Sequence, residues 1–356
     1  MKALILSGGK GTRLRPLTYT SAKQLVPVAN KPVLFYGIEA VVAAGITDVG
    51  IVVGDTREEI RAAVGDGERF GCRVTYLPQE APLGLAHAVY IARDFLADDS
   101  FVMYLGDNLI ANGITALVEE FRALRCNSEI LLARVPNPQQ FGVAELTPEG
   151  KVKRLVEKPR EPKSDLALVG VYMFDASIHE SVRRIKPSAR GELEITDAIQ
   201  DLVDRGLDVH PHIVRGWWKD TGKLEDMLEA NRIVLEAMPD QRGDGRLEGS
   251  SAIEGRVTLG EGVVLRDSLV RGPVVIGAGA MLENAFVGPY TSIGERCRLE
   301  RCEIENSIVL ADAEIRDIPL RIDGSLVGRN VKLVRAGQKP KAYRFMVGDN
   351  SEVGIP

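Results

Sequence analysis

Two aspartates lie in short polar segments that each follow a predicted strand of this sequence. Asp107 lies in Leu-Gly-Asp-Asn, after the apolar residues 101–105, and Asp220 lies in Trp-Lys-Asp-Thr-Gly. Two carboxylates from distant segments, together with phosphate oxygens and water, suit the octahedral coordination of Mg²⁺. Either aspartate alone is more often a turn residue or a helix cap. The pair therefore predicts a magnesium site if the fold brings the two segments together.

Glycines and cations near the start of the chain form a second group suited to chemistry. Residues 2–6 are a short apolar run, which predicts a buried strand, and the segment Ser-Gly-Gly-Lys-Gly-Thr-Arg follows at residues 7–13. Glycines let backbone N–H groups approach a ligand closely, because no Cβ stands in the way. Four cations lie within the fourteen residues 10–23: Lys10, Arg13, Arg15 and Lys23. Backbone donors and cations beyond the end of a strand predict a polyphosphate site.

The spacing of this loop excludes the two commonest phosphate-binding loops. A Walker loop ends in Gly-Lys-Ser/Thr, whereas Gly9-Lys10 is followed here by Gly11. A dinucleotide-binding loop needs a third glycine where this chain has Leu14. In isolation, the segment would be better interpreted as a glycine-rich turn with solvated charges.

Composition limits the class of protein. The chain has 356 residues, a length that suits two domains. Its contents of 45% hydrophobic and 27% charged residues are normal for a globular protein. A net charge of −5 without a basic block argues against nucleic-acid binding. Apolar runs are too short for a membrane span, and we expect no signal peptide before the first strand. The four cysteines are scattered along the chain, so we interpret them as reduced side chains that serve in packing. We therefore expect a cytoplasmic protein, and we expect no membrane partner.

Strand-like and helix-like stretches alternate along residues 1–235. This alternation predicts an α/β, Rossmann-like fold with a mostly parallel sheet covered on both faces, and ligands beyond the carboxyl ends of the strands. We expect strands at 2–6, 49–53, 73–78, 101–105, 166–174 and 209–214, and a hairpin at 143–146 and 152–156. We expect helices at 33–44, 57–64, 85–96, 178–185, 192–205 and 224–238. The predicted domains are 1–238 and 252–356, with a linker at 239–251 rich in Gly, Asp and Arg.

Aliphatic residues repeat every seventeen positions beyond the predicted linker. One series is Leu259, Ile276, Ile293, Leu310 and Val327, and two further series run in phase with it. Hexapeptide periodicity of this kind predicts a parallel β-helix of triangular section, in which each coil buries its aliphatic residues against the next. Hexapeptide acetyltransferases need a histidine base, but His87, His179, His210 and His212 all precede the linker. We therefore expect a structural module for oligomerisation or regulation, and we interpret the histidines as packing or surface residues.

Longer motifs identify a family. The run G-G-x-G-T-R-L-x-P-L-T…K-Q-L-V-P-V…K-P resembles the signature of the sugar-nucleotidyltransferases, as do L-G-D-N, E-K-P at 157–159, S-A-R-G-E-L-E-I-T-D at 188–197 and W-x-D-T-G. The resemblance covers residues 1–235, and left-handed β-helix domains are often fused to such enzymes. Ser7 and the segment 83–87, Leu-Gly-Leu-Ala-His, depart from the usual pattern, which leaves base choice and feedback behaviour open.

The resemblance implies a role for each matched residue. Nucleotide-binding residues would be Leu6, Gly8, Gly9, Gly11, Thr12, Gln24, Gln79, Gly84 and Asp107. Sugar-phosphate-binding residues would be Asn108, Gly142, Glu157, Lys158, Val169, Gly170, Arg190 and Trp218. Arg13, Lys23 and Lys158 would be catalytic, and Asp107 with Asp220 would hold Mg²⁺.

The resemblance also implies substrates. They would be dTTP and α-D-glucose 1-phosphate, which give dTDP-glucose and pyrophosphate. Use of UTP remains an alternative, because a thymine methyl group adds only about 1–3 kcal/mol of discrimination. A catalytically silent, nucleotide-sugar-binding regulatory subunit and a bifunctional acetyltransferase are further alternatives. We expect a homo-oligomer and no nucleic-acid partner.

Overall fold

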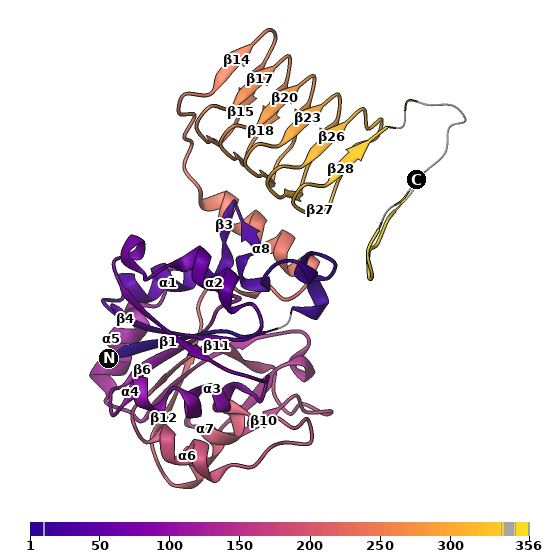
Figure 1. Ribbon diagram of the computed structural model, residues 1–356. Coiled ribbons are helices and arrows are strands. Elements are labelled where there is room, and N and C mark those ends of the chain that lie inside the picture. The colour runs from indigo at the N-terminus through magenta and orange to yellow at the C-terminus, as the bar shows by residue number, and fades with distance from the viewer. Residues whose placement is uncertain (10, 336, 338–344, 346, 355–356) are drawn as a thin grey trace. The chain divides into compact units, whose positions relative to one another are not determined.

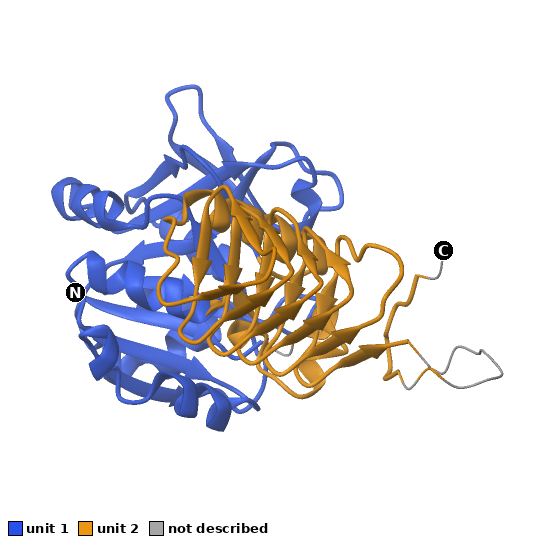
Figure 2. Ribbon diagram, turned by 90° about the horizontal axis from the view of Figure 1, so that it is seen from above, with its two compact units in different colours: residues 1–10, 33–220 blue, residues 11–32, 221–356 orange. Residues whose placement is uncertain are grey.

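The computed structural model describes residues 1–9, 11–335, 337, 345 and 347–354, so the predicted cation Lys10 lies outside the described residues. The chain divides into two compact units, Met1–Lys10 with Val33–Asp220 and Gly11–Pro32 with Thr221–Pro356 (Figure 2). None of the helices in the described part of the chain is sufficiently long and apolar to span a membrane.

One large mixed sheet organises the first unit (Figure 1). Its strands run in the order β10-β9-β11-β6-β1-β4-β5, with β8 paired to β11 and β12 paired to β8. Their bounds are β1 Lys2–Ser7, β4 Asp48–Val53, β5 Arg73–Pro78, β6 Phe101–Leu105, β8 Ser128–Arg134, β9 Gly142–Leu146, β10 Val152–Glu157, β11 Leu166–Phe174 and β12 Val209–Ile213. The pair β1–β4 and the pair β1–β6 are parallel, so these strands end at the same edge of the sheet.

Helices cover both faces of this sheet, as the alternation predicts (Figure 1). The helices are α1 Val33–Ala43, α2 Arg57–Val64, α3 Leu85–Ile91, α4 Arg93–Leu96, α5 Thr115–Leu124, α6 Ile178–Arg184 and α7 Ile195–Asp204. Helices α3, α4, α6 and α7 share one apolar core with strand residues such as Leu4, Met103 and Phe174. Because successive strand residues point to opposite faces, Ala3, Ile5 and Tyr104 belong to the other face.

The predicted elements differ from the structure in a few places. The helix expected at 85–96 is divided into α3 and α4 at Ala92. The predictions did not include α5 or β8, which lie between β6 and β9 along the chain. The hairpin of β9 and β10 is present as predicted, with Val156 opposite Val143.

The second unit contains the predicted parallel β-helix, and its strand pairing fits a left-handed coil (Figure 1). Three sheets of parallel strands form its sides. They are β14 Arg246–Glu248, β17 Val264–Arg266, β20 Met281–Glu283, β23 Arg298–Glu300, β26 Glu314–Arg316 and β28 Lys332–Val334; β15 Ala252–Glu254, β18 Leu269–Arg271, β21 Phe286–Val287 and β24 Glu303–Ile304; and β16 Val257–Leu259, β19 Val274–Ile276, β22 Thr291–Ile293, β25 Ile308–Val309 and β27 Leu326–Val327. Strand β14 lies inside the segment 239–251 that we predict as a linker. The domain boundaries stay a prediction.

The repeat of seventeen residues holds for the first coils and then shortens. Leu259 pairs with Ile276, and Ile276 pairs with Ile293, each seventeen positions later. Ile293 then pairs with Val309 rather than with the predicted Leu310. The next coil therefore closes in sixteen residues, and the predicted series was wrong at Leu310 because strict periodicity does not anticipate a shortened corner.

The second unit also includes the segment Gly11–Pro32. It carries three short 3₁₀ turns, η1 Thr12–Leu14, η2 Leu17–Tyr19 and η3 Lys23–Leu25, and a two-stranded pair of β2 Pro27–Val28 and β3 Lys31–Pro32. Helix α8, Leu224–Ala237, packs on β2 and carries the buried Asn231. Asn231 Oδ1 accepts hydrogen bonds from the backbone N–H of Ala29 (2.8 Å) and from Oγ of Ser292 (2.6 Å). One helix side chain therefore binds both this segment and the β-helix.

Candidate functional site

The end of β1 lies beside the segment that follows β5. A Cβ on Gly8 would lie 3.4 Å from Oε1 of Gln79, the residue after β5. The Gln79 side chain donates a hydrogen bond of 3.3 Å to the carbonyl oxygen of Gly84. Three residues that we predict to contact the base, Gly8, Gln79 and Gly84, are thus brought together at the carboxyl edge of the sheet.

His87 is a member of this group that the motifs missed. Its Nδ1 lies 3.0 Å from Nε2 of Gln79, and burial lowers the pKa of the imidazole. A neutral imidazole accepts a hydrogen bond from the Gln79 amide nitrogen, which leaves Oε1 of Gln79 directed at Gly8. The position of His87, one turn into α3, carries no spacing signal that could have revealed this contact.

The two predicted metal ligands come from a pair of neighbouring strands. Strand β7, Asn108–Ile110, directly follows Asp107, and β13, Trp218–Asp220, ends at Asp220. The two strands are antiparallel, with Asp220 directly opposite Asn108. Asp107 directly precedes the cross-strand partner of Asp220, so the pairing brings the two aspartates to neighbouring positions although 113 positions separate them in the sequence.

Asn108 joins these strands through its side chain. Its Nδ2 donates to Oδ1 of Asp107 over 2.9 Å, and its Oδ1 accepts from the indole Nε1 of Trp218 over 2.6 Å. The Asn108 side chain is 2% exposed. Its carbonyl oxygen also accepts a hydrogen bond of 3.1 Å from the hydroxyl of Tyr104. Asn108 and Trp218, both predicted as sugar-phosphate residues, therefore hold the Asp107 carboxylate in one orientation.

Cations surround Glu157 at the end of β10. Nζ of Lys158 lies 3.6 Å and Nη1 of Arg190 lies 3.3 Å from Oε1 of Glu157. Burial raises the pKa of Glu157, Lys158 lowers it, and Glu194 raises it again. The three predicted sugar-phosphate residues Glu157, Lys158 and Arg190 are therefore one cluster. Sequence reasoning missed two further members, Glu194 and Thr196, although both lie in the S-A-R-G-E-L-E-I-T-D motif.

Two glycines predicted for the sugar pocket lie where a side chain would collide. A Cβ on Gly142 would lie 2.5 Å from Cγ2 of Thr196, and a Cβ on Gly170 would lie 2.6 Å from Oδ1 of Asn108. Val169, also predicted, is fully buried in β11 beside Gly170. The register of β11 against β8 shifts between Leu168 and Tyr172, so the backbone bends at these residues. The bend and the missing Cβ let β11 approach Asn108 closely.

The predicted triphosphate cations Arg13 and Lys23 belong to the second unit. Gly11 has a φ of +61°, and a Cβ there would lie 2.6 Å from Cβ of Lys23. Glycine at this position thus lets the first 3₁₀ turn pack against the third. Arg13 is exposed, whereas Gln24 is only 2% exposed, so the side chain that we predict to contact the nucleotide sugar is covered.

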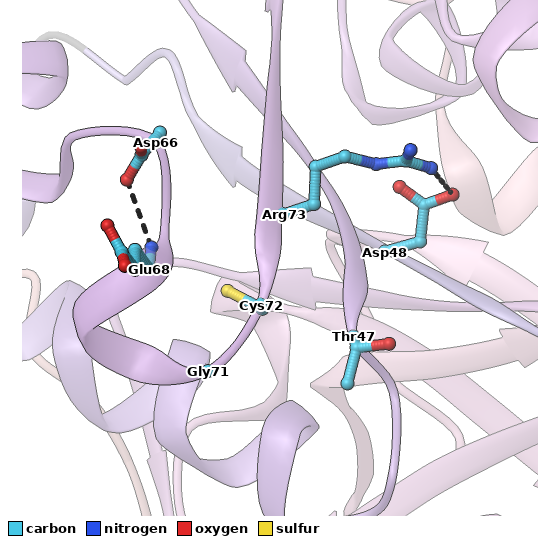
Figure 3. Close-up of a pocket in the computed structure, with 7 residues that line it drawn as sticks. All are labelled: Thr47, Asp48, Asp66, Glu68, Gly71, Cys72 and Arg73. Carbon is cyan, nitrogen blue, oxygen red and sulfur yellow. Dashed lines mark hydrogen bonds and ion pairs between the residues drawn. The ribbon is translucent and has the colours of Figure 1, made fainter.

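A hollow at the opposite edge of the sheet is separate from these groups (Figure 3). It has a volume of about 600 Å³ and lies at the amino ends of β4 and β5, where Asp48 and Arg73 form an ion pair of 3.2 Å. Asp66, Glu68 and the thiol of Cys72 also line it (Figure 3). Ligands of open α/β sheets bind beyond the carboxyl ends of the strands, so this hollow is not part of the candidate site.

The fold and these residue groups define a sugar-nucleotide-forming enzyme class, and the comparisons agree. Residues 2–237 match the family model described as "Nucleotidyl transferase", and the chain belongs to this family of transferases. It is 58% identical over 355 residues to a glucose-1-phosphate thymidylyltransferase of Streptomyces griseus, with 100% of this chain and 99% of the relative covered. The full-length match includes the β-helix, as expected for a long form of such an enzyme.

Solved structures show the same fold for the first two thirds of the chain. One is a putative glucose-1-phosphate thymidylyltransferase from Bacillus anthracis in complex with sucrose, with a TM-score of 0.62, 36% identity and coverage of 65% of this chain and 94% of that chain. Another is a UDP-glucose pyrophosphorylase complexed with UDP-glucose. It has a TM-score of 0.60 and 25% identity, and the match covers 67% of this chain and 99% of that chain.

Proposed function

We propose that the chain joins dTTP and α-D-glucose 1-phosphate to give dTDP-glucose and pyrophosphate. The observation that supports this most is the pairing of β7 with β13, which brings Asp107 and Asp220 to neighbouring positions. The name of the Streptomyces griseus relative supports glucose 1-phosphate and a thymidylyl group as the reacting partners.

The sugar phosphate is held by the cluster around Glu157. Lys158 and Arg190 bind the phosphate, and the guanidinium group contacts it through two parallel hydrogen bonds. Glu157 accepts hydrogen bonds from sugar hydroxyls, and its ion pairs with Lys158 and Arg190 keep both cations beside the substrate. The phosphate monoester is already anionic, so its oxygen attacks the α-phosphorus of the nucleotide without a covalent enzyme intermediate.

The nucleotide is held by backbone and amide groups. Oε1 of Gln79 accepts the N3–H of the pyrimidine, with Gly84 and the Gly8 backbone beside it. Backbone N–H groups and cations bind the triphosphate and stabilise the departing pyrophosphate. The residues assigned to the nucleotide and its phosphates are Leu6, Gly8, Gly9, Gly11, Thr12, Arg13, Lys23, Gln24, Gln79, Gly84 and Asp107.

A divalent metal ion, Mg²⁺, fits the oxygen donors of Asp107 and Asp220. Carboxylate oxygens are the ligands that Mg²⁺ prefers, and the hydrogen bond from Asn108 fixes the orientation of Asp107. The ion would offset negative charge on the phosphate oxygens during displacement. Asn108 and Trp218 position this carboxylate, while Gly170 leaves room for the Asn108 side chain.

Release of pyrophosphate from purified full-length chain tests the proposal. We expect turnover with dTTP, glucose 1-phosphate and Mg²⁺, and formation of dTDP-glucose in an equal amount. Turnover that is faster with UTP would instead support the uridylyltransferase alternative, which the UDP-glucose pyrophosphorylase neighbour favours. Absence of turnover with either nucleotide, together with binding of a nucleotide sugar, would support the regulatory subunit and overturn the proposed function.

We also propose a homo-oligomer assembled through the β-helix and a cytoplasmic location. Cyclic arrangements are common among homo-oligomers, and a stack of coils offers one repeated surface to a second copy. The described cysteines are all free thiols, as is usual in reducing compartments. Light scattering of the full-length chain measures the subunit number, and a monomeric mass would contradict the assembly.

A further inference from the structure

Four ionisable side chains meet on the sheet face beside α5, away from the groups described above. Glu129 lies on β8 and pairs with His210 on β12, and His212 is two residues further along the same face. Glu120 reaches this face from α5, with Oε2 2.9 Å from Nδ1 of His212 and Oε1 3.5 Å from Nε2 of His210. Three ligand atoms, one from each of Glu120, Glu129 and His212, lie within 4.8 Å of one another.

Glu129 is the unusual member of this group. Its side chain is fully buried, and neither carboxylate oxygen has a hydrogen-bond partner among the described residues. An ionised carboxylate that lacks donors is costly to bury, and a cation would remove that cost. Packing alone gives no reason for a glutamate at a buried strand position.

We propose that Glu120, Glu129 and His212 bind a divalent transition-metal ion of the zinc class. Zinc is bound in proteins by imidazole nitrogen and by carboxylate oxygen, and a site with three protein ligands holds water at the fourth position. Ligand atoms of a tetrahedral zinc ion with bonds of about 2.0–2.2 Å lie about 3.3–3.6 Å apart, so separations of up to 4.8 Å would have to shorten by at most about 1.5 Å to complete the site. Imidazole in the ligand set favours zinc over Mg²⁺, which prefers oxygen ligands.

The position of the site indicates a structural role. Helix α5 is the first helix after β7, and β12 is the last strand of the large sheet before β13. The ion would therefore join Glu120 on α5 to His212 on β12, and along the chain α5 follows the strand that carries Asn108 while β12 precedes the strand that carries Asp220. The inference does not depend on the proposed reaction, because none of its ligands belongs to the candidate active site.

The test uses the full-length chain after chelation, reloaded with Zn²⁺ or Co²⁺ in excess Mg²⁺. We expect one retained ion per chain after dialysis, a visible absorption spectrum typical of tetrahedral Co²⁺, and a higher unfolding temperature with Zn²⁺ than without it. Glu129→Gln and His212→Gln should each weaken binding by more than about 10-fold, since even groups that orient a metal ligand typically contribute that much. The exposed neighbour Glu119→Gln is the matched control and should bind as the wild type does.

Three results would overturn the proposal. One is a wild-type chain that retains no zinc or cobalt, and another is a Glu129→Gln variant that retains them unchanged. The third is retention that disappears in Asp220→Asn, which would place the ion at the candidate active site instead. Should Glu129→Gln fail to fold by circular dichroism, the partly exposed Glu120→Gln and His212→Gln variants provide the same comparison.

Discussion

The indole Nε1 of Trp218 donates a hydrogen bond of 2.6 Å to Oδ1 of Asn108. Asn108 uses its amide nitrogen to hold Asp107, so a tryptophan from one segment sets the orientation of a carboxylate in another. The ring of Trp218 is itself fixed edge-on against Phe141, with centroids 5.5 Å apart. This chain of contacts makes Asn108 and Trp218 positioning residues for the proposed metal ligand.

Trp218→Phe removes only the indole donor and keeps an aromatic ring against Phe141. Oδ1 of Asn108 is then a buried acceptor without its donor, which costs about 1–3 kcal/mol. We expect kcat/KM for pyrophosphate release to fall about 10–100-fold, as is typical when a group that orients a metal ligand is lost. The adjacent Trp217→Phe is the control and should be close to wild type. Equal loss in both variants would indicate a general packing defect.

Asp107→Asn and Asp220→Asn preserve the shape of each side chain and remove its charge. Both variants should fold, because β7 and β13 pair through their backbones. We expect each to lose almost all turnover, since a neutral amide is a poor ligand for Mg²⁺. Steady-state rates over a range of Mg²⁺ concentrations are the measurement. Robust activity in either variant would disprove the metal assignment.

Alanine at Gly8 and at Gly84 should give different defects. A Cβ on Gly8 meets Oε1 of Gln79 at an ordinary 3.4 Å, whereas Gly84 has a φ of +105° and its Cβ would overlap the Leu193 carbonyl. We expect Gly8→Ala to keep its unfolding temperature and to raise KM for the nucleotide. Gly84→Ala should be destabilised by more than about 1 kcal/mol. Calorimetry and initial rates distinguish them, and an unaltered KM in Gly8→Ala would argue against nucleotide binding at that loop.

Asn231→Ala tests the connection between the segment Gly11–Pro32 and the β-helix. The variant loses the acceptor for Ala29 N–H and Ser292 Oγ, and the donor to the Tyr290 carbonyl at 3.0 Å. We expect a loss of about 1–3 kcal/mol in stability and reduced turnover, because the same segment carries Arg13 and Lys23. For the same reason, removal of residues beyond 240 should impair chemistry as well as assembly. A truncated chain with unaltered turnover would contradict this.

His179 should make the protein less stable in acid. The side chain is buried and stacked on Phe101, and burial, with Arg93, lowers its pKa from the ordinary 6.5. The unfolded chain therefore binds a proton at a higher pH than the folded chain, so the free energy of unfolding decreases as pH falls below about 6.5. We expect His179→Leu to lose less stability than wild type between about pH 7 and pH 5 in urea titrations. Burial also lowers the pKa of His87, so this histidine preserves part of the pH dependence of stability in the variant. Parallel curves for the two proteins would refute the role of His179.

Local features of the sequence determined much of the fold and of the candidate site. The glycines after the first strand and the aspartates of the L-G-D-N and W-x-D-T-G motifs are local signals, and the repeat of seventeen residues is periodic over its first coils. Steric limits on the backbone and the alternation of side chains along a strand turn such signals directly into structure. The sequence also determined the class of enzyme, because the motifs lie in contiguous segments.

Only the tertiary structure decided which distant residues meet. The pairing of Asp220 with Asn108, the burial of Glu129 beside His212 and the binding of Asn231 to both Ala29 and Ser292 depend on how strands and coils are ordered in space. A residue's own neighbours in sequence carry no information about such contacts. Their free energy comes from desolvation and hydrogen bonds that exist only after the separate segments have packed together.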